Sequence, residues 1–534
     1  MINGAPSSAR SRMRPRTAAV AAATSAVLLL SACGSGGGSS TAARSTGVID
    51  PTGSLSFAWT VPPKNLDPHQ SGNYQLDFTY LSLVFDRLTQ MVDGAEVAPL
   101  LAESWEPSPD GRETTFRLRT DATFHDGSPV DSDAVVASLN RARDEHQARV
   151  ARAFTMIESV EKVDAHTVVV RTNRPAADLP AILSTTEAAV MNPKFFGPDS
   201  TLSIENAGSG AYQFDQIRLG DRVTYKRYDG YWDPEAQKAA SVEVIGLTDD
   251  NARLNAFRGG QVDAILAKAG QVDDLEAITR QPNYLMHTFD VTQFYAIQLD
   301  LGTPGFEDPR IRQALNYAID RENIDVALTN GLCGPTSQPI SAGLQGSDPG
   351  SADRYSYDPD RARELLDEAG VPDGLSLDVI SVTGISPQQE MAIAVQSQLA
   401  DVGVTMNIKP VIQSDAQREF AGGGVGLLHT RLTYPTPVQT LLNNYMTPLR
   451  YPTPPSQEFR EAVEQALDPN LDAEARDKLV SAASATASED AYDVFICALP
   501  TLVAYQDSVV GLDTAGQADF IGVVDLRYVG KTGA

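Results

Sequence analysis

The sequence feature that most constrains the fold is a short apolar run near the start of the chain, residues 18–30. Four arginines between residues 10 and 16 precede it, and small residues lead from it to Cys33. A helix needs about 20 apolar residues to cross a bilayer, so this run is too short to span one. A positive segment, an apolar segment and small residues in that order are typical of a secretory signal. No later run approaches membrane length, so the rest of the chain is expected to fold as a globular protein outside the cytoplasm.

The end of this run, Leu-Ser-Ala-Cys at residues 30–33, resembles the lipobox of bacterial lipoproteins. The resemblance implies that residues 1–32 are a lipoprotein signal peptide and that Cys33 is lipidated at the mature N-terminus. A plain signal peptide with an incidental cysteine is the alternative, and Met13 could be the true start. Residues 33–53 are rich in Gly, Ser and Thr and are predicted to be a flexible tether.

The chain is strongly acidic, with a formal net charge of −27. Loss of the leader, which holds four arginines and no acid, would make the charge more negative still. Such a surface repels nucleic acid and anionic lipid headgroups, so neither is an expected partner and the lipid anchor is the expected membrane attachment. About 500 mature residues exceed what one hydrophobic core supports, and two or three domains are expected.

Two cysteines remain if Cys33 is lipidated, namely Cys333 and Cys497. Outside the cytoplasm a disulfide between them is favoured. Two separately buried thiols are the alternative, because the sequence does not show whether the two α-carbons lie within bonding range.

The pattern of elements indicates an α/β protein. Residues 54–60 alternate as a strand does, and residues 76–88 have the pattern of a helix. Asp308 and Asp358 each precede a proline, which is typical of a helix start. Strands are predicted at 375–380 and 404–411 with a helix at 388–400 between them, and this βαβ order predicts helices layered on a substantial sheet.

Several short blocks occur in a fixed order between residues 55 and 510, and together they resemble one family. These blocks are residues 65–68 (Asn-Leu-Asp-Pro), 98–105, 124–129 (Phe-His-Asp-Gly-Ser-Pro), 133–136, 158–163, 208–212 (Gly-Ser-Gly-Ala-Tyr), 228–232 (Tyr-Asp-Gly-Tyr-Trp), 310–321 and 357–370. They resemble the extracellular solute-binding proteins of peptide-, nickel- and opine-type ABC importers, solute-binding family 5.

The resemblance implies a two-lobed, periplasmic-binding-protein-like clamp of type II, cluster C. The first lobe would cover residues 54–290 with an inserted subdomain at about 99–205. The second lobe would cover 291–505, and 506–534 would return to the first.

A protein of this family would carry a small or peptide-like solute to the permease and ATPase subunits of an ABC transporter. It would act as a monomer on the extracytoplasmic face of the membrane, without cofactor or catalysis. A ligand-presenting sensor and a secreted hydrolase are the alternatives.

The resemblance places ligand contacts in loops at the junction of the lobes. The candidate residues are Asn65, Tyr74, Tyr212, Phe294, Tyr295, His429, Arg431, Thr433 and Tyr434. Tyrosine suits such a site because it combines an apolar face with a hydroxyl that needs a partner. A plain core role for any of these tyrosines remains open.

Thr433 bears on the kind of ligand. Peptide binders of the family commonly carry Asp-Tyr-x-x-Pro here, with the Asp on the peptide's α-ammonium, whereas this chain has Thr-Tyr-Pro-Thr-Pro at 433–437. A buried ammonium without a carboxylate is poorly compensated, which argues against ordinary peptides unless an acid elsewhere substitutes. Arg431 suggests a ligand carboxylate or phosphate instead, unless it faces solvent.

Metal and enzyme sites are not indicated. The six histidines are scattered without metal-ligand spacing, so no metal site is expected, although His429 could serve a chelated nickel ion. The chain lacks a Gly-x-Ser-x-Gly elbow, a His-Glu-x-x-His motif and a P-loop.

Overall fold

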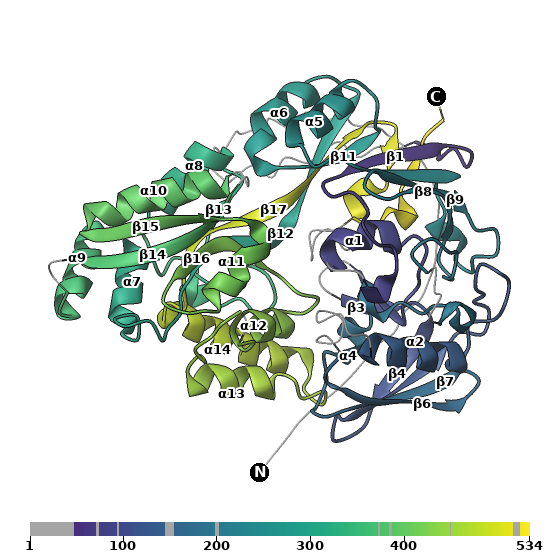
Figure 1. Cartoon of the computed structure of the whole chain (residues 1–534), viewed down its shortest axis with the longest axis horizontal. Coiled ribbons are helices and arrows are strands. Elements are labelled where there is room, and N and C mark those ends of the chain that lie inside the picture. Colours follow the sequence, from purple (N-terminus) through teal and green to yellow (C-terminus); the bar gives the residue numbers. More distant parts are fainter. Residues whose placement is uncertain are drawn as a thin grey trace, which may run out of the picture. The chain divides into compact units, whose positions relative to one another are not determined.

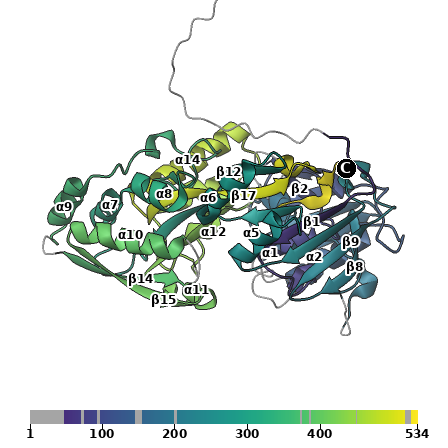
Figure 2. The ribbon, with the colours of Figure 1, turned by 90° about the horizontal axis from the view of Figure 1, so that it is seen from above.

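A computed structural model describes residues 47–533 except 71–73, 93–95, 145–153, 198–201, 372–373, 384–386, 449 and 516–523 (Figures 1 and 2). The predicted signal peptide, Cys33 and most of the predicted tether lie outside the described residues.

One mixed sheet of eleven strands runs through both halves of the described chain, in the order β15-β14-β16-β12-β17-β11-β1-β10-β9-β8, with β13 also paired to β17. Its strands are β1 (Ser54–Trp59), β8 (Tyr212–Arg218), β9 (Arg222–Arg227), β10 (Ser241–Gly246), β11 (Ala264–Ala267), β12 (Tyr284–Gln298), β13 (Gly334–Pro335), β14 (Leu375–Val382), β15 (Val404–Val411), β16 (Gly426–Leu432) and β17 (Asp493–Gln506). Figure 1 shows β12 and the yellow β17 running from the green strands toward β11 and β1. These two long antiparallel strands therefore connect the two halves.

The register of β12 against β17 shifts between Phe289 and Val291 and again between Val291 and Gln293. Such irregularities bend a strand and increase its twist. They lie near residue 290, where the boundary between the lobes is predicted. The limits of the domains remain a prediction.

The N-terminal half has its own core around β1 and α1 (Tyr74–Leu81). The C-terminal segment returns to this core through Val509, Leu512, Leu526 and Val529. The short pairs β2 (Thr89–Val92) with β3 (Glu96–Pro99), and β18 (Val509–Val510) with β19 (Gly530–Lys531), lie in the same half.

The helix predicted over 76–88 is too long, because α1 ends at Leu81. Beyond it the chain carries Asp86 and Arg87, both fully buried, into a polar network. Asp86 accepts a hydrogen bond from the Tyr231 hydroxyl and lies 3.8 Å from the Arg527 guanidinium. This tertiary network overrides the helical pattern.

A separate four-stranded sheet, β4-β5-β7-β6, forms within residues 102–172. It comprises β4 (Ala102–Pro107), β5 (Glu113–Leu118), β6 (Ile157–Asp164) and β7 (Thr167–Thr172). It packs with α2 (Ser132–Asp144) and α4 (Leu179–Ile182) over a core of its own. This sheet therefore has a core separate from that of the main sheet, and the inserted subdomain stays a prediction.

The C-terminal half layers helices on both faces of the sheet. One face carries α5 (Asp250–Arg258), α6 (Val272–Thr279), α7 (Pro309–Tyr317), α8 (Arg321–Thr329), α9 (Pro359–Glu368) and α10 (Gln388–Asp401). The remaining helices are α11 (Gln413–Phe420), α12 (Pro437–Tyr445), α13 (Gln457–Gln465) and α14 (Ala473–Glu489). Asp308 and Asp358 accept backbone hydrogen bonds at the starts of α7 and α9, which confirms both predicted caps.

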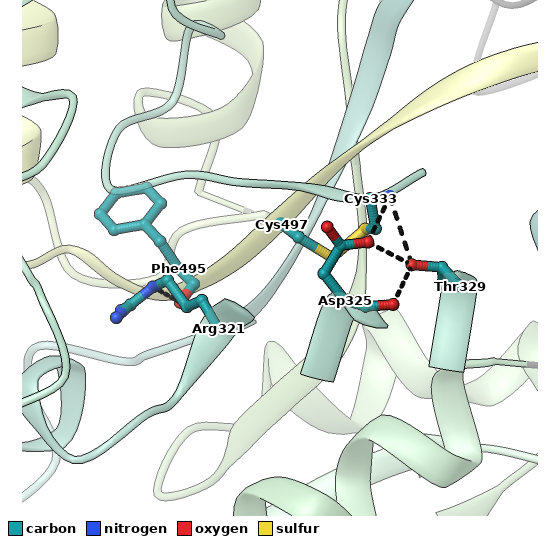
Figure 3. Close-up of a disulfide and its surroundings, with 6 residues drawn as sticks. All are labelled: Arg321, Asp325, Thr329, Cys333, Phe495 and Cys497. Carbon is teal, nitrogen blue, oxygen red and sulfur yellow. Dashed lines mark hydrogen bonds between the residues drawn. A yellow bond between two sulfur atoms is a disulfide. The ribbon is translucent and has the colours of Figure 1, made fainter. Parts of the chain in front are cut away.

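Cys333 and Cys497 form a disulfide in the structure, with their α-carbons 5.3 Å apart (Figure 3). The bond joins the segment after α8 to β17. Asp325 and Thr329 of α8 both accept the backbone N–H of Cys333, and Arg321 donates to the carbonyl of Phe495. Strand β17 is therefore fixed to α8 by a covalent bond and by hydrogen bonds.

Among the described residues, no helix combines the length and the apolar character needed to cross a membrane.

Candidate ligand-binding site

Pairing of β12 with β16 brings four predicted site residues together. Phe294 lies opposite Arg431, Tyr295 opposite Thr430, and Ala296 opposite His429. Residues directly opposite in an antiparallel pair share a face, so Phe294, His429 and Arg431 point to one side of the sheet and Tyr295 to the other.

Arg431 is fully buried, which excludes the solvent-facing alternative. Its Nε lies 3.5 Å from Asp493 Oδ2, its Nη2 donates to the Asn444 carbonyl, and its guanidinium lies 4.9 Å from the Tyr445 ring centre. Burial opposes the charge, yet Asp493 together with Tyr445 and Tyr451 outweighs burial and raises the pKa of Arg431. The charge of Arg431 is therefore compensated inside the protein, and its predicted contact with a ligand anion remains a prediction.

His429 is half-buried, and its Nε2 lies 3.0 Å from Gln298 Oε1. Burial, together with Arg431 and Arg450, holds its pKa well below the ordinary value, so the imidazole is neutral. In the part of the chain that the structure describes, no cluster of three His, Cys, Asp or Glu side chains is placed to hold a metal ion.

Tyr295 belongs to the main core of the C-terminal half, and burial raises its pKa to about 12. Tyr212 has the same kind of role in the N-terminal half. It is fully buried, and its hydroxyl donates to the Ala239 carbonyl at 2.9 Å. Both tyrosines therefore have the core role that the sequence left open, and a ligand contact for either stays a prediction.

Thr433 and Tyr434 directly follow β16. Thr433 is 7% exposed, and the backbone N–H of Tyr434 donates to Thr440 Oγ1 at 2.9 Å. The Arg450 guanidinium lies 5.8 Å from the centre of the Tyr434 ring. The loop is thus anchored to the first turns of α12.

In the N-terminal half, Asn65 shapes its own loop. Its Oδ1 accepts from the backbone N–H of Asp67, and its Nδ2 donates to Gln70 Oε1. Asp67 in turn binds both terminal nitrogens of Arg141, at 2.7 and 3.0 Å. Tyr74 begins α1, and its side chain lies outside what the structure describes.

His69 in the same loop gives a pH-dependent prediction. Burial, then the charge of Arg141, lowers its pKa to about 3, so it stays neutral in the folded state while the unfolded chain binds a proton below about pH 6.5. Because the unfolded state binds more protons between these values, stability should fall as the pH falls, by about 2 kcal/mol at pH 5 for this residue. Urea unfolding at pH 7.5 and 5 would measure it, and His69→Asn should flatten the dependence while His166→Asn should not. An unchanged dependence in His69→Asn would contradict the assignment.

Sequence reasoning missed Arg141 and Asp493, the partners of Asp67 and Arg431. No local pattern links either pair, because each contact forms only when distant segments pack. A buried acid next to a buried base could have been suspected only from the rule that buried charges are paired.

Known proteins resemble this chain in sequence and in fold. The family model "Bacterial extracellular solute-binding proteins, family 5 Middle" matches residues 96–448. The glutathione-binding protein GsiB of Pectobacterium atrosepticum is 27% identical over 380 residues, covering 69% of this chain and 71% of its own.

Two solved structures share the fold. AgaA from A. tumefaciens R10, in complex with agropinic acid, has a TM-score of 0.76 and 25% identity and covers 90% of this chain and 99% of its own. DppA from Helicobacter pylori, in complex with the peptide STSA, has a TM-score of 0.76 and 21% identity, with coverage of 90% and 98%. The fold is thus that of two-lobed periplasmic binding proteins, and the chain belongs to the bacterial extracellular solute-binding proteins of family 5, which deliver solutes to ABC transporters.

Proposed function

We propose that this protein is a lipid-anchored receptor for a small organic solute other than an ordinary peptide. The anchor is supported by the Leu-Ser-Ala-Cys sequence at residues 30–33 and by the Gly/Ser-rich stretch that follows it. Tethering raises the effective concentration of a receptor at the membrane, and the two or three acyl chains of a lipoprotein hold firmly where one would not.

The anchor gives a direct prediction. Cys33→Ser should abolish incorporation of a labelled fatty acid and move the protein from the membrane fraction to the soluble fraction. Cys333→Ser should keep the label, because that cysteine lies in the disulfide and not in the leader. Equal labelling of the Cys33→Ser variant and the parent would contradict the proposed anchor.

The main observation on the chemical class of the ligand is that residue 433 is a threonine, Thr433, and not an acid. Thr433 stands buried at the end of β16, and its hydroxyl offers no negative charge to a peptide α-ammonium. A buried ammonium that lacks a carboxylate costs several kcal/mol, so free-N-terminus peptides should bind weakly. The name of one relative refers to agropinic acid, which supports a small organic solute.

The decisive experiment is mass spectrometry of the solute released from the purified protein. We expect a small organic solute and weak or absent binding of tri- and tetrapeptides in calorimetry. Thr433→Asp should gain peptide affinity by roughly tenfold, as expected for a charge-assisted hydrogen bond worth about 1.5 kcal/mol, whereas the isosteric Thr433→Val should not. Recovery of ordinary peptides from the parent protein would overturn the proposal.

Two other functions are the alternatives. A sensor would bind the same solute but present it to a receptor, so loss of the permease would leave its response intact. A secreted hydrolase would turn over peptides or glycosides. We propose that the protein binds its solute without converting it. Saturable product formation from a panel of peptides or glycosides would contradict this proposal.

A further inference from the structure

Lys268 directly follows β11, at a junction of the main sheet. Strand β11 pairs with β1 on one side and with β17 on the other, where Ala267 lies opposite Leu502. Lys268, the residue after β11, therefore lies near Thr501, which pairs with Phe289 of β12. Lys268 thus stands where the two connecting strands pass between the halves of the chain.

The backbone gives the direction of the Lys268 side chain. Lys268 is extended, with φ −116° and ψ 146°, so the alternation of β11 continues through it. Ala267 packs into the core shared with Leu502 and Tyr295, whereas Leu266 packs on the opposite face with Trp59 and Phe289. Lys268 consequently points to the face of Leu266.

That face also carries candidate ligand residues. The core that contains Ala267 and Tyr295 covers one side of the sheet as far as Leu428 of β16. Phe294 and Arg431 point away from it, since they alternate with Tyr295 and Thr430. Lys268 and the segment that leads to Thr433 therefore lie on the same side of the sheet.

The ammonium of Lys268 has no direct partner in the described part of the chain. Lys268 is half-buried, and among the residues described here none forms an ion pair or hydrogen bond with its ammonium. Burial lowers its pKa, against an opposing attraction from Asp250. Asp250 is already paired with Arg253 at 2.5 Å, and Arg253 also donates to the carbonyls of Leu247 and Leu266.

We propose that Lys268 binds a carboxylate of the transported solute. A poorly solvated ammonium without a partner is unfavourable, and a ligand anion at this position would remove that penalty. The inference rests on the proposed function, since it names the chemical class of the same solute. It also assigns the anion-binding role to a cation that forms no ion pair with a described acid, whereas Arg431 is paired with Asp493.

The test uses the full chain and pairs of compounds that differ in charge. The probes are glutathione, a series of mono- and dicarboxylic acids, their methyl esters, and sugar phosphates, each assayed by thermal shift and then by calorimetry. We expect at least one carboxylic acid to bind while its ester does not. Lys268→Met should weaken that binding at least tenfold, Lys268→Arg by less than threefold, and Lys478→Met on the exposed side of α14 not at all.

Each other outcome counts against the inference. An unchanged affinity in Lys268→Met, with normal binding of an acid or a neutral solute, would overturn the role of Lys268 and leave the receptor function standing. Binding of phosphates alone would overturn the carboxylate. Failure of the parent protein to bind any compound, with no solute released on denaturation, would contradict the receptor function and the inference together.

Discussion

Replacing Asp493 by asparagine should lower the free energy of unfolding by about 3–5 kcal/mol. The change keeps the shape of the side chain but leaves Arg431 charged, buried and without its acid. The Tyr445 hydroxyl donates to Asp493 Oδ2 at 2.6 Å, so this hydrogen bond also weakens. Urea unfolding followed by fluorescence would measure the loss.

A second variant separates the charge effect from packing. Asp493→Leu combined with Arg431→Met removes both charges, and we expect it to recover more than half of the lost stability, since a buried pair often adds little over apolar residues. Glu474→Gln, which breaks the exposed pair with Lys478, should change stability by less than about 1 kcal/mol. A loss below about 1 kcal/mol in Asp493→Asn would show that Arg431 is compensated by other groups.

Local signals in the sequence predicted much of the C-terminal half. The Asp-Pro starts of α7 and α9, and the strand–helix–strand order of β14, α10 and β15, depend on residues near one another in the chain. Capping and alternation are local effects, so a single sequence contains them.

The sequence did not predict β12 and β17, the two strands that connect the halves. Strand β17 is buried along nearly its whole length, so apolar residues occupy both of its faces and no alternation appears. The pairing of β12 with β17 shifts register at three places, which interrupts the pattern of the strand. The fold class could be predicted without them, but the position of Lys268 near Thr501 could not.

The candidate site was also predicted only in part: the sequence indicated its residues but not the pairing of its charges. The sequence placed Phe294, His429 and Arg431 near one another through family resemblance, and the β12–β16 pairing brings them together. The sequence could not show which charged side chains pair with each other. Asp493 contacts Arg431 from another strand, and Asp250 forms an ion pair with Arg253 near Lys268. Which cation is left without an acid is a property of the packed structure.

Removal of the Cys333–Cys497 disulfide is expected to have an effect of similar size. The bond spans a sequence separation of 164 residues, and closing so long a loop restricts the unfolded chain by about 5 kcal/mol in the chain-entropy model. Measured losses on removing native disulfides are about 2–5 kcal/mol, so Cys333→Ala combined with Cys497→Ala should lose stability within that range. Alanine is preferred to serine because both sites are fully buried and a hydroxyl there would need a partner.

The matching control uses the redox state of the parent protein. In a soluble Cys33→Ser form, dithiothreitol under unfolding conditions should lower the urea midpoint to that of the double variant, while the double variant should not respond. Non-reducing peptide mapping should recover Cys333 and Cys497 in one linked fragment. Asp325 and Thr329 hold the Cys333 backbone, and Arg321 binds the Phe495 carbonyl of β17, independently of the sulfur atoms. The folded double variant should therefore keep β17 in place and bind solute with unchanged affinity. Equal urea midpoints for the oxidised parent and the double variant would mean that the loop is already restricted in the unfolded chain, and the expected stabilisation would then be wrong.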